Sequence, residues 1–354
     1  MRATTLHAPF DVRLEQAPDP AVEGPRDAVV RVLASCICGS DLWPYRGDPA
    51  PSRPRRMGHE FVGVVEAAGD DVTAVRVGDL VVAPFLWSDG TCDYCARGLQ
   101  TSCRAGGGYG GTDRQGRLVD GGQGEYVRVP EADGTLVAAP SSVGDAATVG
   151  DAVLRSLLAL SDVMGTGHHA ALAARVRPGS TVAVVGDGAV GLCAVLAARR
   201  LGAERVIAMS RHESRQELAR RFGATDVVAE RGEAGAKAVT ELLGGIGADS
   251  VLECVGTKAS MDQALASVRD GGAVGYVGVP HGVEFPARQL FGRNVSVGGG
   301  VAPVRAYLPE LLADVAAGTL DPGPVFDLEL PLDDVAEGYR AMDERRAVKV
   351  LLRP

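Results

Sequence analysis

Apolar residues in the first 150 positions recur in short runs of the β type. The runs 27–35 (DAVVRVLAS) and 60–69 (EFVGVVEAAG) are rich in β-branched residues and end at polar or glycine positions. The runs 76–85 and 124–140 repeat this pattern. Such runs between turn residues are typical of strands. They predict a small β-rich domain with long loops, in which the glycine-dense segment 104–124 forms a loop.

The pattern changes after about residue 165, where buried-type strands alternate with helical stretches. The segment 180–203 reads as an apolar strand at Thr181–Val185, a glycine turn and an alanine-rich helix. Further apolar runs begin near 205, 226, 248 and 271. Alternating strands and helices predict an α/β fold with a doubly wound parallel sheet. The region from about residue 300 onward predicts a helix, a turn, a helix and a strand.

Length and charge narrow the class of protein. A chain of 354 residues, of which 46% are hydrophobic, is long enough for two domains with full cores. The net charge of −9 argues against a nucleic-acid or anionic-membrane partner. No apolar run approaches the roughly 20 residues of a membrane helix. The charged, alternating N-terminus does not resemble a signal peptide. We therefore expect a cytoplasmic protein with reduced cysteines.

A glycine pattern follows the strand at Thr181–Val185. Gly186, Gly188 and Gly191 form a G-x-G-x-x-G that includes Ala189 and Val190 at the start of the next helix. This arrangement allows a tight turn, close approach of a pyrophosphate and tight helix–strand packing. An ordinary strand–helix turn is the alternative, but the context favours a dinucleotide-binding loop.

The end of the second strand of this fold indicates which dinucleotide is bound. Ser210 ends the strand, Arg211 and Arg215 follow, and the first acidic residue after it, Glu213, lies only within the next turn. NAD-binding folds usually place a carboxylate at the strand end, whereas a hydroxyl and guanidinium groups suit a 2′-phosphate. The sequence therefore favours NADP(H) over NAD(H). The alternative is that these arginines form the solvated start of a helix.

Several motifs together resemble one known family. They are Cys-Gly-Ser-Asp at 38–41, Gly-His-Glu at 58–60, Gly63, Gly69, Gly78-Asp79, the TGHHAA segment after 165, the glycine loop and the VKVLL segment. The chain resembles the zinc-dependent medium-chain dehydrogenase/reductase family, of the alcohol dehydrogenase type. This resemblance implies a GroES-like catalytic domain at 1–163, a Rossmann coenzyme domain at 164–298 and a return to the catalytic domain at 299–354.

The resemblance also implies a catalytic zinc ion held by Cys38, His59 and Asp162, with Glu60 close to the metal. Taken singly, each residue has an ordinary structural explanation, as core residue, paired histidine or helix cap. The resemblance further assigns Ser40 to the substrate oxygen and to proton transfer. It implies coenzyme contacts that we expect from the following residues: Thr166, Val255, Val277 and Val279.

A second metal site is implied in the segment 89–103. Family members carry four cysteines in the spacing C-x2-C-x2-C-x7-C. Cys92, Cys95 and Cys103 match the last three positions, and Asp89 occupies the first. A carboxylate is an acceptable zinc ligand, although it is harder than a thiolate. We expect a structural zinc site here, and a lobe without metal is the alternative.

These residues predict an NADP(H)-dependent zinc alcohol dehydrogenase or carbonyl reductase acting on a small molecule. Two alternatives stay open: a reductase of an iminium or conjugated C=C bond, and a catalytically silent NADPH-binding protein, against which the three apparent zinc ligands and Ser40 argue. Trp43 stands where many family members carry a proton-transferring histidine, so we expect it at the substrate pocket. The resemblance implies a homodimer or homotetramer.

Overall fold

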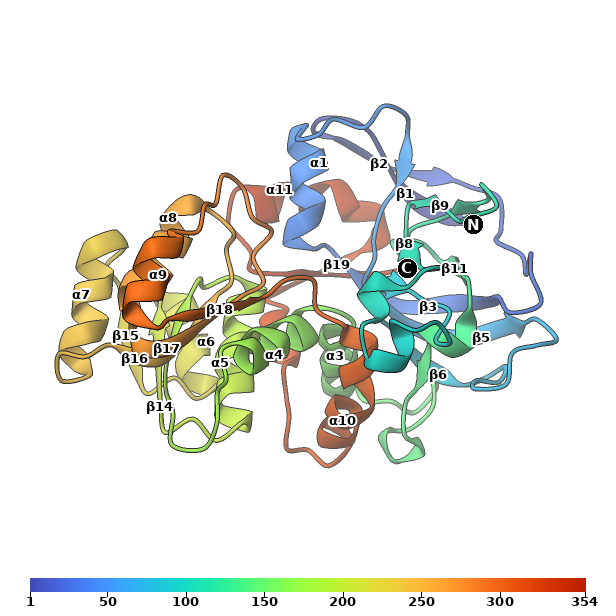
Figure 1. The fold of residues 1–354 in the computed structure, drawn as a ribbon. Helices are drawn as coiled ribbons and strands as arrows, with labels where there is room; N and C mark the ends of the chain where they lie inside the picture. Colours follow the sequence, from blue (N-terminus) through green and yellow to red (C-terminus); the bar gives the residue numbers. More distant parts are fainter. The chain divides into compact units, whose positions relative to one another are not determined.

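The computed structural model describes residues 1–354 and divides into two compact units. Residues 1–162 and 303–354 together form the first unit, and residues 163–302 form the second (Figure 1). The second unit is therefore inserted between two segments of the first. No helix in the structure is both long and apolar enough to cross a bilayer.

The first unit is built on a mixed seven-stranded sheet with a smaller sheet beside it. The large sheet has the strand order β12-β6-β5-β3-β20-β19, and β11 also pairs with β3. The small sheet has the order β2-β1-β4. The strands of these sheets are β1 (Arg2–Ala8), β2 (Asp11–Gln16), β3 (Ala28–Cys36), β4 (Arg55–Arg56), β5 (Phe61–Ala68), β6 (Leu80–Ala83), β11 (Tyr126–Val129), β12 (Val137–Ala138), β19 (Leu328–Pro331) and β20 (Val350–Arg353).

Five helices and two pairs of two-residue strands complete the first unit. Its helices are α1 (Leu42–Arg46), α2 (Ala132–Thr135), α3 (Asp151–Leu160), α10 (Val304–Ala316) and α11 (Val335–Asp343). Its remaining strands are β7 (Leu86–Trp87), β8 (Gly107–Gly108), β9 (Gly111–Thr112) and β10 (Leu118–Val119). β7 pairs with β8, and β9 pairs with β10.

Alternating apolar positions explain why these strands enclose cores. One cluster of buried side chains joins residues of β3, β5, β6 and β11, among them Val30, Phe61 and Val127. A second joins α11 and β20 to β1 through Tyr339, Val350 and Leu6. Because the strand period is two, one face of each strand supplies these clusters.

The second unit is a doubly wound parallel sheet. Its strand order is β15-β14-β13-β16-β17-β18, and each neighbouring pair is parallel. The strands are β13 (Thr181–Val185), β14 (Arg205–Met209), β15 (Asp226–Val228), β16 (Ala248–Glu253), β17 (Val268–Tyr276) and β18 (Ser296–Gly299). The helices are α4 (Val163–Ala173), α5 (Ala189–Arg200), α6 (Glu213–Arg221), α7 (Gly232–Leu242), α8 (Lys258–Ser267) and α9 (Ala287–Arg293).

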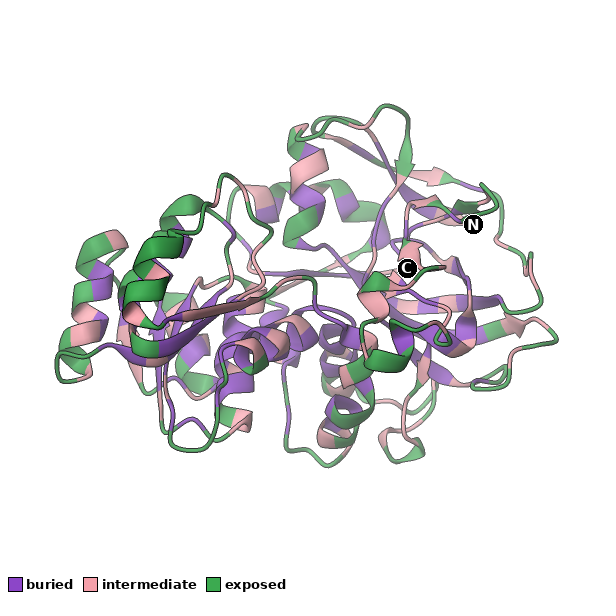
Figure 2. Ribbon diagram, viewed as in Figure 1, coloured by how far each residue is buried: buried purple, intermediate pink, exposed green.

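Helices cover both faces of this sheet, as buried parallel strands require. α4, α5 and α6 lie on one side, and α7 and α8 lie on the other (Figure 1). The central strands are buried, whereas the outer faces of α7 and α9 are exposed (Figure 2). The α/β class and the parallel sheet expected from the sequence are confirmed.

Two local expectations were wrong. The segment 104–124 is not loop throughout, because it contains β8, β9 and β10. Glycine-rich backbone can pair over two residues without the apolar pattern that marks a longer strand. The region after 300 also contains β19 between its two helices, where Pro331 and Glu329 in LELP hide the strand pattern.

Candidate metal centres and coenzyme loop

Strand pairing brings the first group of metal-ligand residues together. Ser35, near the end of β3, pairs with Phe61 at the start of β5. Cys38 therefore follows β3 beside His59 and Glu60, which precede β5. Asp162 lies two residues after the end of α3, and α3 packs against β3 and β5. One ligand atom from each of Cys38, His59, Glu60 and Asp162 lies within 4.8 Å of the others.

The spacing of these atoms fits a zinc ion. Cys38 Sγ lies 3.5 Å from Asp162 Oδ2, and His59 Nε2 lies 3.6 Å from the same oxygen. Zinc bonds of about 2.0–2.3 Å place tetrahedral ligand atoms about 3.3–3.8 Å apart. Glu60 Oε2 is buried and has no hydrogen-bond partner. The donor set and the orphan oxygen are thus chemically suited to a divalent cation.

Charge at this group also favours a cation. Burial lowers the pKa of His59, but the neighbouring charges of Asp41 and Cys38 outweigh burial and raise it well above its usual value. The cluster therefore stabilises positive charge on the imidazole. The same anionic groups would stabilise a metal ion that takes the place of that proton.

An outer layer of polar residues orients His59. Asp41 Oδ1 lies 3.4 Å from His59 Nδ1, and Asp41 Oδ2 accepts a hydrogen bond from the Cys38 N–H at 3.0 Å. Gln123 donates to the same oxygen at 3.3 Å, and the Tyr339 hydroxyl donates to Gln123 at 3.0 Å. Carboxylates in this position fix the ring orientation of metal-binding histidines. Sequence reasoning missed these roles, although Asp41 ends the Cys-Gly-Ser-Asp motif.

A buried ion pair supports Glu60. Lys349 Nζ lies 2.7 Å from Glu60 Oε1, and both side chains are at most 1% exposed. Burial lowers the pKa of Lys349, but its electrostatic interactions with the side chains around it, Cys36 and Glu60 first, raise it well above its usual value. Lys349 thus offsets part of the burial that raises the pKa of Glu60, and the pair leaves the second carboxylate oxygen without a partner. Nothing in the local sequence signals Lys349, because it is 289 residues from Glu60.

The segment 89–103 gathers the second group of metal-ligand residues. Ligand atoms of Asp89, Cys92, Cys95 and Cys103 lie within 4.8 Å of one another. Cys92 Sγ is 3.6 Å from Cys95 Sγ and 3.9 Å from Cys103 Sγ. Tetrahedral Zn–S bonds of about 2.3 Å place sulfurs about 3.8 Å apart. The three sulfurs and the carboxylate therefore fit a closed, structural site.

Asp89 is held as an anion in this segment. Burial raises its pKa, but the N–H groups of Cys92 and Thr91, which donate to Oδ1 at 3.0 and 2.9 Å, lower it to about 2. The N–H of Asp89 itself points at Cys103 Sγ at 3.2 Å. Such N–H···S contacts stabilise a thiolate, which is the form of cysteine that binds metal.

The glycine loop of the second unit joins β13 to α5. Gly186 adopts φ +118°, which favours glycine. A Cβ on Gly191 would lie 2.0 Å from the Gly186 carbonyl oxygen, so only glycine allows this approach. At Gly188, the residue before Ala189, a Cβ would meet nothing within 4 Å. Open space at Gly188 and the N–H groups at the start of α5, at Ala189 and Val190, are the features that a bound anion requires.

The residues expected to bind the 2′-phosphate of the coenzyme lie at and just after the carboxyl end of β14. Ser210 is buried at the strand end, Arg215 is largely buried, and Arg211 is exposed with its guanidinium unpaired. Sequence reasoning missed Asp187, which lies between the first two glycines. Its carboxylate accepts a hydrogen bond from Ser210 Oγ at 2.8 Å. A carboxylate therefore does lie at this strand end, supplied by the loop rather than by the strand.

The other expected residues lie as follows. Ser40 is exposed in the turn before α1, and Trp43 is half-buried within α1. Thr166 lies in α4, half-buried. Val255, Val277 and Val279 follow the carboxyl ends of β16 and β17. A Cβ on Gly186 would lie 2.8 Å from Val255, so that valine borders the glycine loop.

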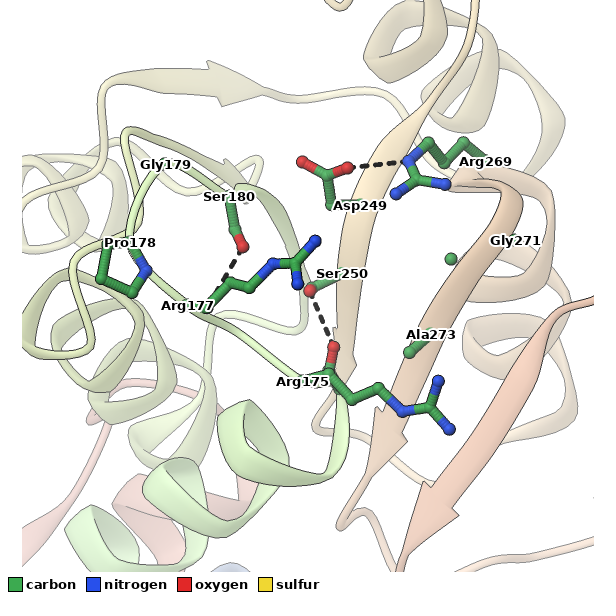
Figure 3. A pocket seen from close by; sticks show the side chains of 12 residues that line it. Arg175, Arg177, Pro178, Gly179, Ser180, Asp249, Ser250, Arg269, Gly271 and Ala273 are labelled. Atoms are coloured by element: carbon green, nitrogen blue, oxygen red, sulfur yellow. Dashed lines mark hydrogen bonds and ion pairs between the residues drawn. The ribbon is translucent and has the colours of Figure 1, made fainter.

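A cavity of about 410 Å³ lies at the amino ends of the strands of the same sheet, opposite the end that carries the glycine loop (Figure 3). It is lined by Arg175, Arg177 and residues at the amino ends of β13, β16 and β17, including Asp249 and Arg269. Ligands of open parallel sheets bind at the carboxyl ends of the strands. The cavity therefore lies outside the expected coenzyme site.

Comparison with known proteins agrees with both units. Residues 24–141 match the model of the alcohol dehydrogenase GroES-like domain, and residues 189–317 match that of the zinc-binding dehydrogenases. A probable zinc-binding alcohol dehydrogenase of Mycobacterium tuberculosis is 37% identical over all of this chain and 89% of its own. A zinc-type alcohol dehydrogenase-like protein, AdhB of Bacillus subtilis, is 33% identical over the full length of both chains.

The fold is also that of solved alcohol dehydrogenases. The alcohol dehydrogenase TADH from Thermus sp. ATN1 is 36% identical, with a TM-score of 0.90 over all of this chain and 99% of its own. A two-unit chain with a GroES-like part, a dinucleotide fold and zinc-type donors defines a zinc-dependent oxidoreductase. The protein belongs to the zinc-dependent medium-chain dehydrogenase family and is of the alcohol dehydrogenase type.

Proposed function

We propose that the protein transfers a hydride between NADP(H) and an alcohol or carbonyl substrate, with a catalytic zinc ion bound by Cys38, His59 and Asp162. The observation that carries this proposal is the convergence of those three donors with Glu60 in one buried group. Held by these residues, a zinc ion would act as a Lewis acid toward the substrate oxygen, and a bound nicotinamide would supply or accept the hydride.

The residues of the chain have separate tasks in this proposal. Asp41 holds the His59 ring, and Lys349 pairs with Glu60 beside the other donors. Ser40 hydrogen-bonds the substrate oxygen and passes its proton on, because a hydroxyl can donate and accept at once. Gly186, Gly188 and Gly191 receive the pyrophosphate, and Thr166, Val255, Val277 and Val279 border the rest of the coenzyme.

We propose NADP(H) as the preferred coenzyme, bound through Ser210, Arg211 and Arg215. The exposed, unpaired guanidinium of Arg211 supports this, since planar guanidinium groups match phosphate geometry. Arg211→Ala should weaken NADPH binding about tenfold to a hundredfold, the usual effect of losing a charge-assisted contact. NADH binding should hardly change. A wild-type enzyme that uses both coenzymes equally would refute the preference.

The function is tested by zinc analysis and coenzyme turnover on the same preparation. Alcohols with NADP⁺ or NAD⁺, and aldehydes and ketones with NADPH or NADH, should be assayed in parallel. Turnover that requires bound zinc supports the proposal. Full turnover after complete removal of zinc, or no turnover on any alcohol or carbonyl, contradicts it.

A second candidate function rests on Trp43. The indole N–H has no basic lone pair and cannot pass on a proton as a histidine does. Reduction of an iminium makes no alkoxide and needs less proton transfer. If the substrate is an alcohol, Trp43→His should raise the rate of its oxidation near neutral pH more than it changes the binding of NADPH. An enzyme that reduces iminium or conjugated C=C compounds but no carbonyl favours the second candidate.

We also propose a homodimer or homotetramer. Large apolar side chains are exposed on the second unit, with Phe291 87% exposed in α9 and Val301 62% exposed after β18. Contiguous apolar patches mark surfaces through which proteins associate, and side chains such as these would contribute to one. Sedimentation equilibrium of the wild-type protein would measure the mass, and a monomer at micromolar concentration would contradict this expectation.

A further inference from the structure

The carboxylate of Asp187 interacts with two of the three residues that the proposed function assigns to the 2′-phosphate, Ser210 and Arg215. Its Oδ2 accepts the hydrogen bond from Ser210 Oγ at 2.8 Å. Arg215 Nη1 lies 3.3 Å from Asp187 Oδ1 and donates to the Asp187 carbonyl oxygen at 3.3 Å. The side chains of Asp187 and Arg215 are 11% and 13% exposed. Water and salt therefore screen this ion pair only weakly.

The two coenzymes would interact differently with this carboxylate. A carboxylate accepts hydrogen bonds and cannot donate them when ionised. It can therefore accept from a ribose 2′-hydroxyl, as acidic residues do in NAD-binding folds. A 2′-phosphate offers only negative charge and acceptor oxygens, so it would be repelled. It would also have to take Ser210 and Arg215 away from Asp187.

We propose that Asp187 is a coenzyme-specificity residue that restrains binding of NADP(H) by occupying Ser210 and Arg215. This inference rests on the proposed function in assuming that the adenosine ribose lies at Ser210. The position of Asp187 in the first turn of the glycine loop explains how it reaches the strand end. Arg211 is then the cation left free for the 2′-phosphate in the unbound protein.

The test compares two asparagine variants of the full-length protein. In Asp187→Asn, the affinity for NADPH, measured by titration of coenzyme fluorescence, should rise about tenfold to a hundredfold, because a buried like charge is removed. NADH affinity should stay the same or fall. The rise should be mostly lost in Asp187→Asn combined with Arg215→Ala, because the freed guanidinium is then absent.

Asp249→Asn is the matched control. Asp249 also accepts from a hydroxyl, Thr181 Oγ1 at 2.8 Å, and from an arginine, Arg269 Nε at 2.7 Å. It lies at the amino end of β16 in the same unit and lines the cavity (Figure 3), whereas the glycine loop follows the carboxyl end of β13. Asp249→Asn removes the same charge and should leave the NADPH-to-NADH affinity ratio unchanged.

The outcomes separate this inference from the proposed coenzyme preference. The wild-type ratio of NADPH to NADH affinity alone tests the preference. An unchanged ratio in Asp187→Asn overturns the role of Asp187, whatever the wild-type preference is. An equal change in Asp249→Asn overturns it as well, because the effect would then arise from overall charge.

Discussion

Cys38 supplies the only sulfur among the four donors of the first group. A serine in its place offers a neutral hydroxyl, which binds zinc far more weakly than a thiolate. Cys38→Ser should remove about one zinc ion per chain and lower turnover at least about a hundredfold, since Lewis-acid assistance is worth several kcal/mol. Zinc analysis and steady-state rates measure both effects.

Cys193→Ala is the control for that variant, because Cys193 is buried in α5 of the second unit and belongs to neither group of ligands. It should keep full zinc content. Retention of zinc and activity by Cys38→Ser would show that the catalytic metal is bound elsewhere.

Single residues were predictable from the sequence where a motif fixes their chemistry. Cys38, His59 and Asp162 are far apart in sequence, yet the motifs around them indicate one site, and the structure brings them together. Gln123 and Tyr339 carry no such pattern, because only the folded chain places them behind Asp41. In the sequence Asp187 is only one position of a glycine loop, because its reach across to β14 depends on a rotamer that the sequence does not show.

At the scale of elements, the segment 89–103 is folded around its ligands. It contains only short 3₁₀ turns and few apolar residues, so a metal ion would replace a core. The wild-type protein should contain about two zinc ions per chain, and Asp89→Ala should lose one and unfold at lower temperature. Asp89→Cys should hold the second zinc ion longer against a chelator, because thiolate is the softer ligand.

Metal analysis before and after dialysis against chelator measures this prediction. Cys38→Ser serves as the converse control, because it should lose the other ion and keep the one in segment 89–103. One zinc ion per wild-type chain, with no change in Asp89→Ala, would contradict a second site.

Two glycines of the loop are expected to have different roles: Gly191 in folding and Gly188 in coenzyme binding. A Cβ at position 191 would lie 2.0 Å from a backbone oxygen, so Gly191→Ala must move α5 away from β13. We expect a loss of about 1–3 kcal/mol in the free energy of unfolding. Gly188→Ala meets no atom within 4 Å and should cost less than about 1 kcal/mol, yet weaken coenzyme binding.

Urea unfolding and coenzyme titration of both variants test the two roles. Equal destabilisation by Gly188→Ala and Gly191→Ala would contradict the separation. The elements themselves were predictable here because a strand, a glycine turn and a helix have distinct periods. β8, β9 and β10 were not, since two-residue pairings leave no period to detect.

At the scale of the whole molecule, the Lys349–Glu60 pair links distant parts of the first unit. Lys349→Met leaves a buried carboxylate without its cation, which typically costs about 3–5 kcal/mol. Urea unfolding should show this loss. Glu60→Gln combined with Lys349→Met should recover most of it, because no charge is then left unpaired. If the double variant is as unstable as the single one, packing rather than charge explains the effect.

The two-part organisation of the first unit was implied by family resemblance and could not be derived from local patterns. The sequence shows a strand-forming VKVLL segment but not its neighbours. The structure places β20 between β3 and β19, with Leu351 opposite Cys36. Such pairing between distant segments depends on the total packing of the unit, which periodicity does not report.

The position of β20 has a consequence for how the protein is made. During synthesis, residues 163–302 leave the ribosome before β20 exists, so the dinucleotide fold has all its strands early. In the sheet that carries Cys38 and His59, β3 lacks its partner at Ser35 and Cys36 until β20 is added, although β11 pairs with the other end of β3 earlier. Over that interval Glu60 also lacks Lys349. The metal-binding half of the enzyme, although begun first, is the half that matures last.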